Sequence, residues 1–232
     1  MGELEQFPIN IIARIKSDFH TKFGIPRQSG IVNSLQSTII FEPEFQSPDA
    51  LRGIEEFTHL WLIWQFSENA DNSWSPTVRP PRLGGNTRMG VFATRSPFRP
   101  NPIGLSCVKL LGIEKTSNNG TVIHVAGADL MDGTPILDIK PYIPYADCHT
   151  DASGGFTVGN NRFQLDIDFP QSLLECVPQN KRDALFELLS NDPRPAYQND
   201  PARIYGIAFA GMDIRFTVEN SVLHVVSIDD YK

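Results

Sequence analysis

The chain has 232 residues, of which 41% are hydrophobic and 20% charged, values typical of a soluble globular protein with a sizeable core. Its formal net charge of −7 argues against indiscriminate binding of nucleic acid. No stretch approaches the roughly 20 apolar residues that cross a bilayer. Three cysteines without CxxC spacing, and an acidic first segment without an apolar run, favour a cytoplasmic protein over a secreted or zinc-binding one.

Short strands and loops alternate in the first part of the chain. Apolar, β-branched and aromatic residues predict strands at 8–16, 37–42 and 57–66. Glycine and proline mark a loop at 24–30. At 47–54, a serine cap and a first-turn proline predict a short helix.

More strand candidates follow, at 89–94, 103–114, 120–127 and 135–140. Asn118-Asn119-Gly120 predicts a hairpin turn, because asparagine and glycine tolerate a positive φ. Many short strands with few helices indicate a barrel or a sandwich. We therefore expect a mainly β domain over residues 1–150.

A change in composition at 151–161 predicts a linker. Beyond it, apolar spacing predicts a helix at 179–190, which the prolines of 192–195 would end. Strands are predicted at 203–209, 212–218 and 221–228. We expect residues 162–232 to form a small α+β domain.

A basic segment interrupts this acidic chain, since no acidic residue occurs between Asp71 and Glu114. It contains six cations: Arg79, Arg82, Arg88, Arg95, Arg99 and Lys109. Prolines between the arginines favour a rigid surface over a floppy tail. Guanidinium groups match phosphates and carboxylates, and Phe92 and Phe98 offer stacking faces for a base. A solvated loop is the alternative, but the absence of counter-charges favours an anionic ligand.

Two acidic motifs follow, Asp129–Pro135 and Asp138–Tyr142. A polar turn ahead of a short strand places Asp129 and Asp132 at a strand end, where their carboxylates can bind a ribose hydroxyl or an amine. Equally, these aspartates can cap the backbone of their own turn. The residues alone leave both interpretations open.

Several common signatures are missing. The sequence has no GxGxxG after a strand, no Walker A loop and no HExxH, and its histidines lack metal-ligand spacing. A nucleotide-binding Rossmann loop and a metal centre are therefore not expected. A serine–histidine–aspartate arrangement has no nucleophile-elbow signature to support it.

Five stretches are long and specific enough to compare with a known family: Pro26-Arg27-Gln28, Thr77–Gly85, Gly90–Gly104, Asp129–Pro135 and Asp138–Tyr142. Together they resemble the TrmO family, also called TsaA-like or YaeB-like. The later stretch Asp192–Tyr197 is similar to the C-terminal domain of its bacterial members. The resemblance covers nearly the whole chain, with only a loose match at 144–165.

What the resemblance implies is a single-sheeted β-barrel that binds S-adenosylmethionine and a C-terminal domain that assists tRNA binding. It also implies a homodimer and a reaction without a metal. The reaction would be N6-methylation of threonylcarbamoyl-adenosine at position 37 of tRNA, beside the anticodon. Two alternatives stay open: a barrel that binds S-adenosylmethionine or RNA without catalysis, and methyl transfer to a small molecule.

Site residues follow from the same resemblance and from the chemistry of the motifs. The expected donor contacts are Arg27, Gln28, Ser67, Glu68, Arg95, Leu105, Asp129, Leu130, Met131 and Asp132. Ser67-Glu68 departs from the His-Gln pair expected at that place. For tRNA we expect Arg82, Arg88, Arg99, Asn101, Arg194, Tyr197 and Arg203. The catalytic candidates are Asp138, Lys140 and Tyr142, with Asp138 or a nearby carbonyl accepting from N6 and Tyr142 stacking on the base.

Overall fold

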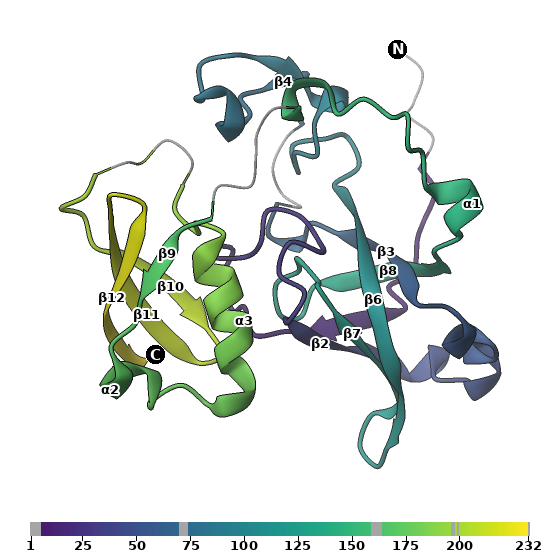
Figure 1. The fold of residues 1–232 in the computed structure, drawn as a ribbon. Coiled ribbons are helices and arrows are strands. Elements are labelled where there is room, and N and C mark those ends of the chain that lie inside the picture. The colour runs from purple at the N-terminus through teal and green to yellow at the C-terminus, as the bar shows by residue number, and fades with distance from the viewer. Residues whose placement is uncertain (1–5, 70–73, 159–163, 196–197, 199, 232) are drawn as a thin grey trace.

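Six antiparallel strands pair in a ring and close a barrel in the order β1-β2-β7-β6-β3-β8 (Figure 1). Their bounds are β1 Ala13–Lys16, β2 Gln36–Phe41, β3 His59–Gln65, β6 Ile103–Thr116, β7 Gly120–Ala126 and β8 Pro135–Pro141. The structure is a computed structural model that describes residues 6–69, 74–158, 164–195, 198 and 200–231, apart from the side chains of Asn69 and Arg82. The predicted mainly β fold with a single-sheeted barrel is confirmed.

Buried and exposed side chains alternate along the strands, and the buried ones fill the barrel. In β3 the side chains of Leu60, Leu62 and Trp64 are buried, whereas the residues between them are partly exposed. The other strands contribute further buried aliphatic side chains to the same cluster. A barrel of so few strands is filled by side chains and leaves ligand space only at its ends.

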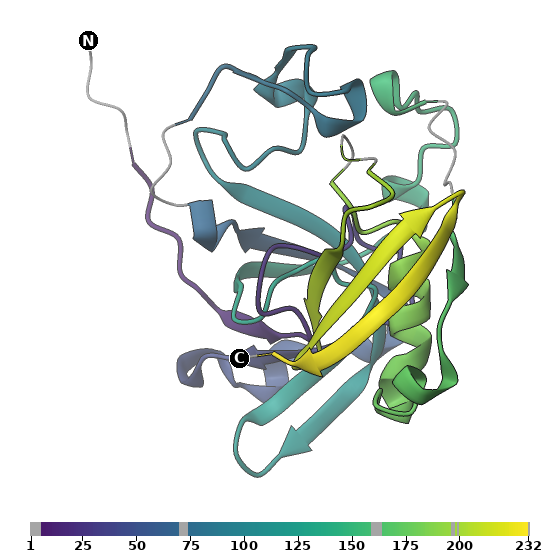
Figure 2. The same ribbon diagram turned by 90° about the vertical axis from the view of Figure 1, so that its left-hand side faces the viewer.

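A second, four-stranded sheet has the order β10-β11-β12-β9 and carries one long helix. The bounds are β9 Asp166–Asp168, α2 Gln171–Leu174, α3 Gln179–Ser190, β10 Tyr205–Phe209, β11 Met212–Glu219 and β12 Val222–Asp230. Figure 1 shows α3 between this sheet and the barrel, and Figure 2 views the sheet from the side away from the barrel. The buried face of α3 consists of Ala184, Leu185, Leu188 and Leu189.

Short elements complete the chain. They are η1 Pro43–Phe45, η2 Pro48–Leu51, η3 Ile54–Glu56, η4 Ser67–Asn69, β4 Thr77–Val78, η5 Pro81–Leu83, β5 Met89–Gly90, η6 Val91–Ala93, α1 Pro144–Asp147 and η7 Gly155–Thr157. Most of them lie in the connections on either side of β3, and those between β4 and η6 carry part of the basic segment away from the barrel wall (Figure 1).

Most of the predicted elements are present. The helix at 179–190 coincides with α3, and Gly120 has the positive φ of 64° expected for the β6–β7 turn. The strand predicted at 89–94 is wrong beyond β5. Strand β5 pairs with the two-residue β4, and the chain then turns into η6, which buries Val91. The predicted helix at 47–54 is only the 3-10 turn η2.

Because Gly104 has no side chain, the indole ring of Trp64 can lie close to the backbone of β6. A Cβ at this position would lie 2.3 Å from an atom of the indole ring. We predict that Gly104→Ala lowers the free energy of unfolding by about 1–3 kcal/mol, because overpacking forces the ring to move. Thermal unfolding and tryptophan fluorescence measure the change. Gly90→Ala is the matched control, since a Cβ there meets nothing within 4 Å, and an equal loss in both variants would contradict the prediction.

Candidate functional site

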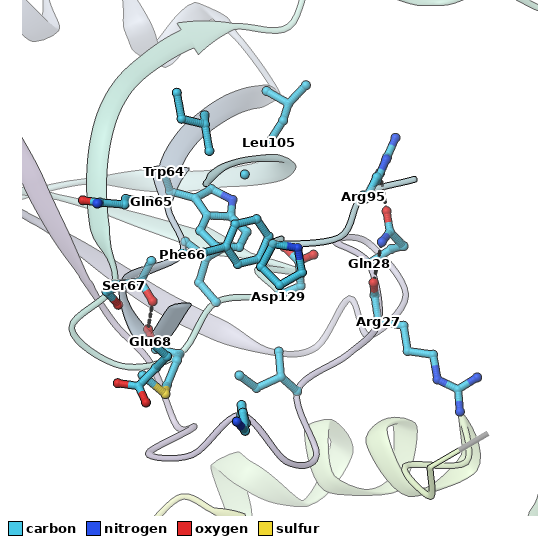
Figure 3. Close-up of a pocket in the computed structure, with 18 of the residues that line it drawn as sticks. Arg27, Gln28, Trp64, Gln65, Phe66, Ser67, Glu68, Arg95, Leu105 and Asp129 are labelled. Atoms are coloured by element: carbon cyan, nitrogen blue, oxygen red, sulfur yellow. Dashed lines mark hydrogen bonds between the residues drawn. The ribbon is translucent and has the colours of Figure 1, made fainter. Parts of the chain in front are cut away.

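A cavity of about 550 Å³ opens at one end of the barrel, where β3 ends and β6 begins. Its volume falls within the range of small-molecule sites. Five stretches of chain line it: residues 22–28, the end of β3 with 66–68, residues 94–99, the start of β6 and residues 129–134 (Figure 3). These stretches come from three connections of the barrel, β1–β2, β3–β6 and β7–β8, which meet because neighbouring strands are antiparallel.

The cavity contains two aromatic rings and a partly buried carboxylate. Trp64 and Phe66 pack with ring centroids 4.3 Å apart, and Asp129 lies beside them (Figure 3). The indole Nε1 of Trp64 donates to Ser106 Oγ at 2.9 Å, and Ser106 Oγ donates to Asp129 Oδ1 at 2.5 Å. Ser106 is fully buried, so this chain of hydrogen bonds fixes the Asp129 carboxyl group from behind.

Asp129 is the ionisable group that this environment perturbs most clearly. Burial raises the pKa of Asp129, because a carboxylate loses hydration inside the protein. The hydrogen bonds from Ser106 and from the Ser29 backbone, together with the charge of Arg95, act in the opposite direction. A partly buried carboxylate at the edge of a cavity is suited to bind a cationic or hydrogen-donating ligand group.

Arginines form one side of the cavity. Arg95 Nη1 donates a hydrogen bond to Gln28 Oε1, and Gln28 Nε2 donates to the Arg27 carbonyl at 2.5 Å (Figure 3). Arg99 Nη1 donates to the Thr94 carbonyl at 2.9 Å and thereby braces its own loop. This side of the cavity can bind a carboxylate or a phosphate.

The cavity brings together nine of the ten expected donor residues: Arg27, Gln28, Ser67, Glu68, Arg95, Leu105, Asp129, Leu130 and Met131. The tenth, Asp132, lines a second, more open pocket and accepts a hydrogen bond from the Ser17 amide at 2.9 Å. Asp132 therefore binds the backbone of the connection after β1 rather than that of its own turn, and ligand binding by Asp129 stays a prediction.

Sequence reasoning missed three residues that build the cavity: Trp64, Phe66 and Ser106. A signal was available in β6, where Ser106 lies in phase with Gly104 and Val108 on the inward face. A hydroxyl at an inward position of an apolar strand must find a buried partner.

The three catalytic candidates lie on the outer face of the barrel, outside the cavity lining. Asp138 pairs with Ile63 of β3, which in turn pairs with Leu105 of β6. Two strand spacings therefore separate Asp138 from the cavity residue Leu105, about 10 Å between backbones. Asp138 Oδ2 lies 2.7 Å from Lys140 Nζ, and both side chains are substantially exposed.

Tyr142 directly follows β8 and lies in an aromatic cluster with His59 and Trp61. Its ring centroid lies 5.7 Å from that of Trp61, whose indole donates to Asp147 Oδ2 at 3.0 Å. Hydrogen bonds from the Ile143 amide and from Trp61 lower the pKa of Asp147. Partial burial and then the neighbouring acidic groups raise the pKa of Tyr142, so its phenol stays protonated at neutral pH.

The tRNA candidates are distributed over both parts of the molecule. Arg88 and Asn101 are exposed in the basic segment, and Arg99 reaches the cavity. Arg194 forms a bidentate pair with Asp192, at 2.8 and 2.9 Å, which raises the pKa of Arg194. Arg203 is exposed, with its guanidinium 5.6 Å from the ring centroid of Tyr205. The side chain of Arg82, and Tyr197 as a whole, lie outside the described residues.

Within the part of the chain that the structure describes, no three His, Cys, Asp or Glu side chains are grouped so as to hold a metal ion. In the same residues, no helix is long and apolar enough to cross a membrane.

A closed antiparallel barrel with an aromatic and arginine-lined cavity at one end defines a small-ligand-binding β-barrel. The family model described as the tRNA-methyltransferase O N-terminal domain matches residues 14–148. The model of the TrmO C-terminal domain matches residues 164–231. The chain belongs to the TrmO family.

Relatives cover the chain almost completely. The Escherichia coli protein named tRNA (adenine(37)-N6)-methyltransferase is 37% identical, over 97% of this chain and 99% of its own length. A Pseudomonas aeruginosa protein named as an S-adenosylmethionine-dependent methyltransferase, RcsF, is 38% identical over 90% of this chain and 91% of its own. The crystal structure of TrmO from Pseudomonas aeruginosa superimposes with a TM-score of 0.79 at 32% identity, covering 99% of both chains.

The hydrogen bonds from Trp64 to Ser106 and from Ser106 to Asp129 lead to a prediction about stability. Ser106→Ala leaves the buried indole N–H without its acceptor, which costs about 1–3 kcal/mol of unfolding free energy. The loss should be larger at pH 7 than at pH 4. The folded pKa of Asp129 is already raised, so its ionisation destabilises the fold as pH rises, and removing the Ser106 donor raises that pKa further.

Thermal unfolding across this pH range measures both effects. Ser37→Ala, which removes another buried serine of the barrel, is the matched control. A pH-independent loss in Ser106→Ala would show that the hydroxyl does not act through Asp129.

Proposed function

We propose that the protein transfers the methyl group of S-adenosylmethionine to N6 of adenine 37 in tRNA, the activity in the name of its Escherichia coli relative. We further propose that the adenine carries a threonylcarbamoyl group. The observation that carries the proposal is the cavity at the end of the barrel, whose aromatic, acidic and basic parts match the three chemical parts of the donor.

The residues fit the donor as follows. Trp64 and Phe66 offer apolar faces to an adenine ring. The carboxylate of Asp129 suits the cationic sulfonium or the amino group, and the guanidinium groups of Arg27 and Arg95 suit the carboxylate. When bound, S-adenosylmethionine supplies an electrophilic methyl group on its sulfonium.

The acceptor nitrogen needs help from the protein. Its lone pair is delocalised into the ring, and a carbamoyl substituent withdraws it further, so a proton acceptor and correct alignment with the methyl group would lower the barrier. Asp138 is the proposed acceptor, with Lys140 holding its carboxylate at 2.7 Å. Tyr142 is the proposed stacking partner of the base. Asp138, Ile63 and Leu105 lie side by side across β8, β3 and β6 on the outer face of the barrel. A base placed over these three residues reaches the edge of the donor cavity.

The basic segment is the proposed tRNA surface. Arg88 and Asn101 are available to anticodon-loop phosphates, and Arg99 to the threonylcarbamoyl carboxylate close to the cavity. The C-terminal domain would add Arg203 and the 194–197 stretch. We also propose that the protein acts in the cytoplasm as a homodimer and without a metal.

A transfer assay tests the proposed reaction. The protein is mixed with methyl-labelled S-adenosylmethionine and tRNA, with or without the threonylcarbamoyl group. Label is expected in the anticodon-loop nucleoside of the modified tRNA only. Binding of both ligands without incorporation would instead identify a non-catalytic binding module, and label in the unmodified tRNA would contradict the proposed substrate.

Asp138→Asn tests the proposed acceptor. An amide cannot take up the N6 proton, so we expect the single-turnover rate to fall by about 10²-fold or more while tRNA affinity stays unchanged. Rapid-quench methylation and filter binding measure the two quantities. Asp166→Asn, at an exposed position of β9, is the control. Full activity of Asp138→Asn would assign the proton to another group.

A further inference from the structure

The wall of the cavity that carries Arg27 and Gln28 belongs to the connection between β1 and β2, residues 17–35. This connection leaves the barrel, passes beside α3 and returns (Figure 1). Three of its side chains, Phe19, Val32 and Leu35, are buried in the C-terminal core. The connection between β1 and β2 thus forms this wall, and the C-terminal core packs against the connection.

Close packing fixes the connection at its tip as well. A Cβ on Gly24 would lie 2.9 Å from Cγ2 of Ile207, so the backbone of the connection lies directly on β10. Ile25 packs against the same core immediately before the cavity residues. Arg27 Nη2 donates to the Arg194 carbonyl at 3.0 Å, which ties the arginine itself to the C-terminal domain.

Glu187 of α3 makes the most specific of these contacts. Its Oε1 accepts from the Asn33 amide at 2.8 Å, and its Oε2 accepts from the Ser34 amide at 3.0 Å and from the Ser34 hydroxyl at 2.5 Å. Three donors on one carboxylate form a charge-assisted clamp on the backbone. The neighbouring leucines of α3 face the core, so the helix joins the C-terminal sheet to the connection.

The barrel side contacts both ends of the connection. Gly30 N donates to the Gly127 carbonyl, Gly127 N to the Leu35 carbonyl, and the Cys107 amide to Ser29 Oγ. At the start of the connection, the Ser17 amide donates to Asp132 Oδ1 at 2.9 Å, and the Phe19 carbonyl accepts from the Asp132 amide at 2.8 Å. Within the stretch 22–28, which faces the cavity, Gly24, Ile25 and Arg27 contact the C-terminal domain, whereas Gln28 accepts a hydrogen bond from Arg95.

We propose that Glu187 is a positioning residue for the donor site, and that the C-terminal domain shapes this site in addition to any contact with tRNA. The inference rests on the proposed function, because it assumes that the cavity holds S-adenosylmethionine. Releasing the clamp lets Arg27 and Gln28 move, and a displacement of about 1 Å is enough to weaken a ligand site strongly.

Calorimetric titration with S-adenosylhomocysteine, the donor without its methyl group, tests the inference on the full chain. Glu187→Gln puts an amide N–H in place of one accepting oxygen, and we expect its affinity to fall roughly tenfold. Ser34→Ala removes one of the three donors, so a smaller loss in the same direction is expected. Glu219→Gln, an exposed glutamate at the end of β11, is the matched control.

Two further measurements separate positioning from general destabilisation. Amide exchange at residues 22–34 should accelerate in Glu187→Gln while the barrel strands stay protected. Binding of tRNA should remain at the level of the unaltered protein. Equal donor affinity in Glu187→Gln and Glu219→Gln would overturn the inference, as would equal losses for donor and tRNA. If the unaltered protein fails to bind S-adenosylhomocysteine, the donor assignment itself falls, and the inference with it.

Discussion

The pairing of β1 with β8 is the contact on which the rest of the structure depends. It closes the ring of strands through Ala13 and Ile136, and its last bonds join Ile15 to residues 133 and 134. Closure brings the connection that follows β1 and the turn that precedes β8 to the same end of the barrel. The Asp129 carboxylate and the Arg27 wall therefore face one space although about a hundred residues separate them. The pairing of β2 with β7 holds the same two segments together from the other side, where Gly30 N donates to the Gly127 carbonyl.

Much of the fold could be predicted from the chain, because alternation in β3 and β6 and the apolar spacing of α3 are local signals. The strand expected at 89–94 failed because, among the described residues, Val91 and Phe92 have no strand to pair with once β4 ends. The motifs identified one side of the cavity, including Arg95 and Asp129. Its aromatic and hydrogen-bonded interior was missed, because the link from Trp64 to Ser106 depends on the register between two strands.

The site combines opposite demands on one carboxyl group. Burial of Asp129 disfavours its charge, yet Ser106 and the Ser29 amide donate to that charge and keep it usable. Such a group gives up some stability of the free protein to favour a cationic ligand group. On the outer face, Asp138 and Lys140 are exposed and neutralise each other, so their environment changes only when a partner covers them.

Burial of Phe19, Val32 and Leu35 in the C-terminal core also constrains how the protein is made. During synthesis the barrel strands leave the ribosome first and can pair, since their contacts are complete within the first part of the chain. The connection between β1 and β2 then lacks its packing surface until α3 and β10–β12 have emerged. Its apolar side chains stay open to chaperones and proteases in that interval. Docking of the C-terminal sheet therefore completes the packing of the connection that carries Arg27 and Gln28 at the cavity.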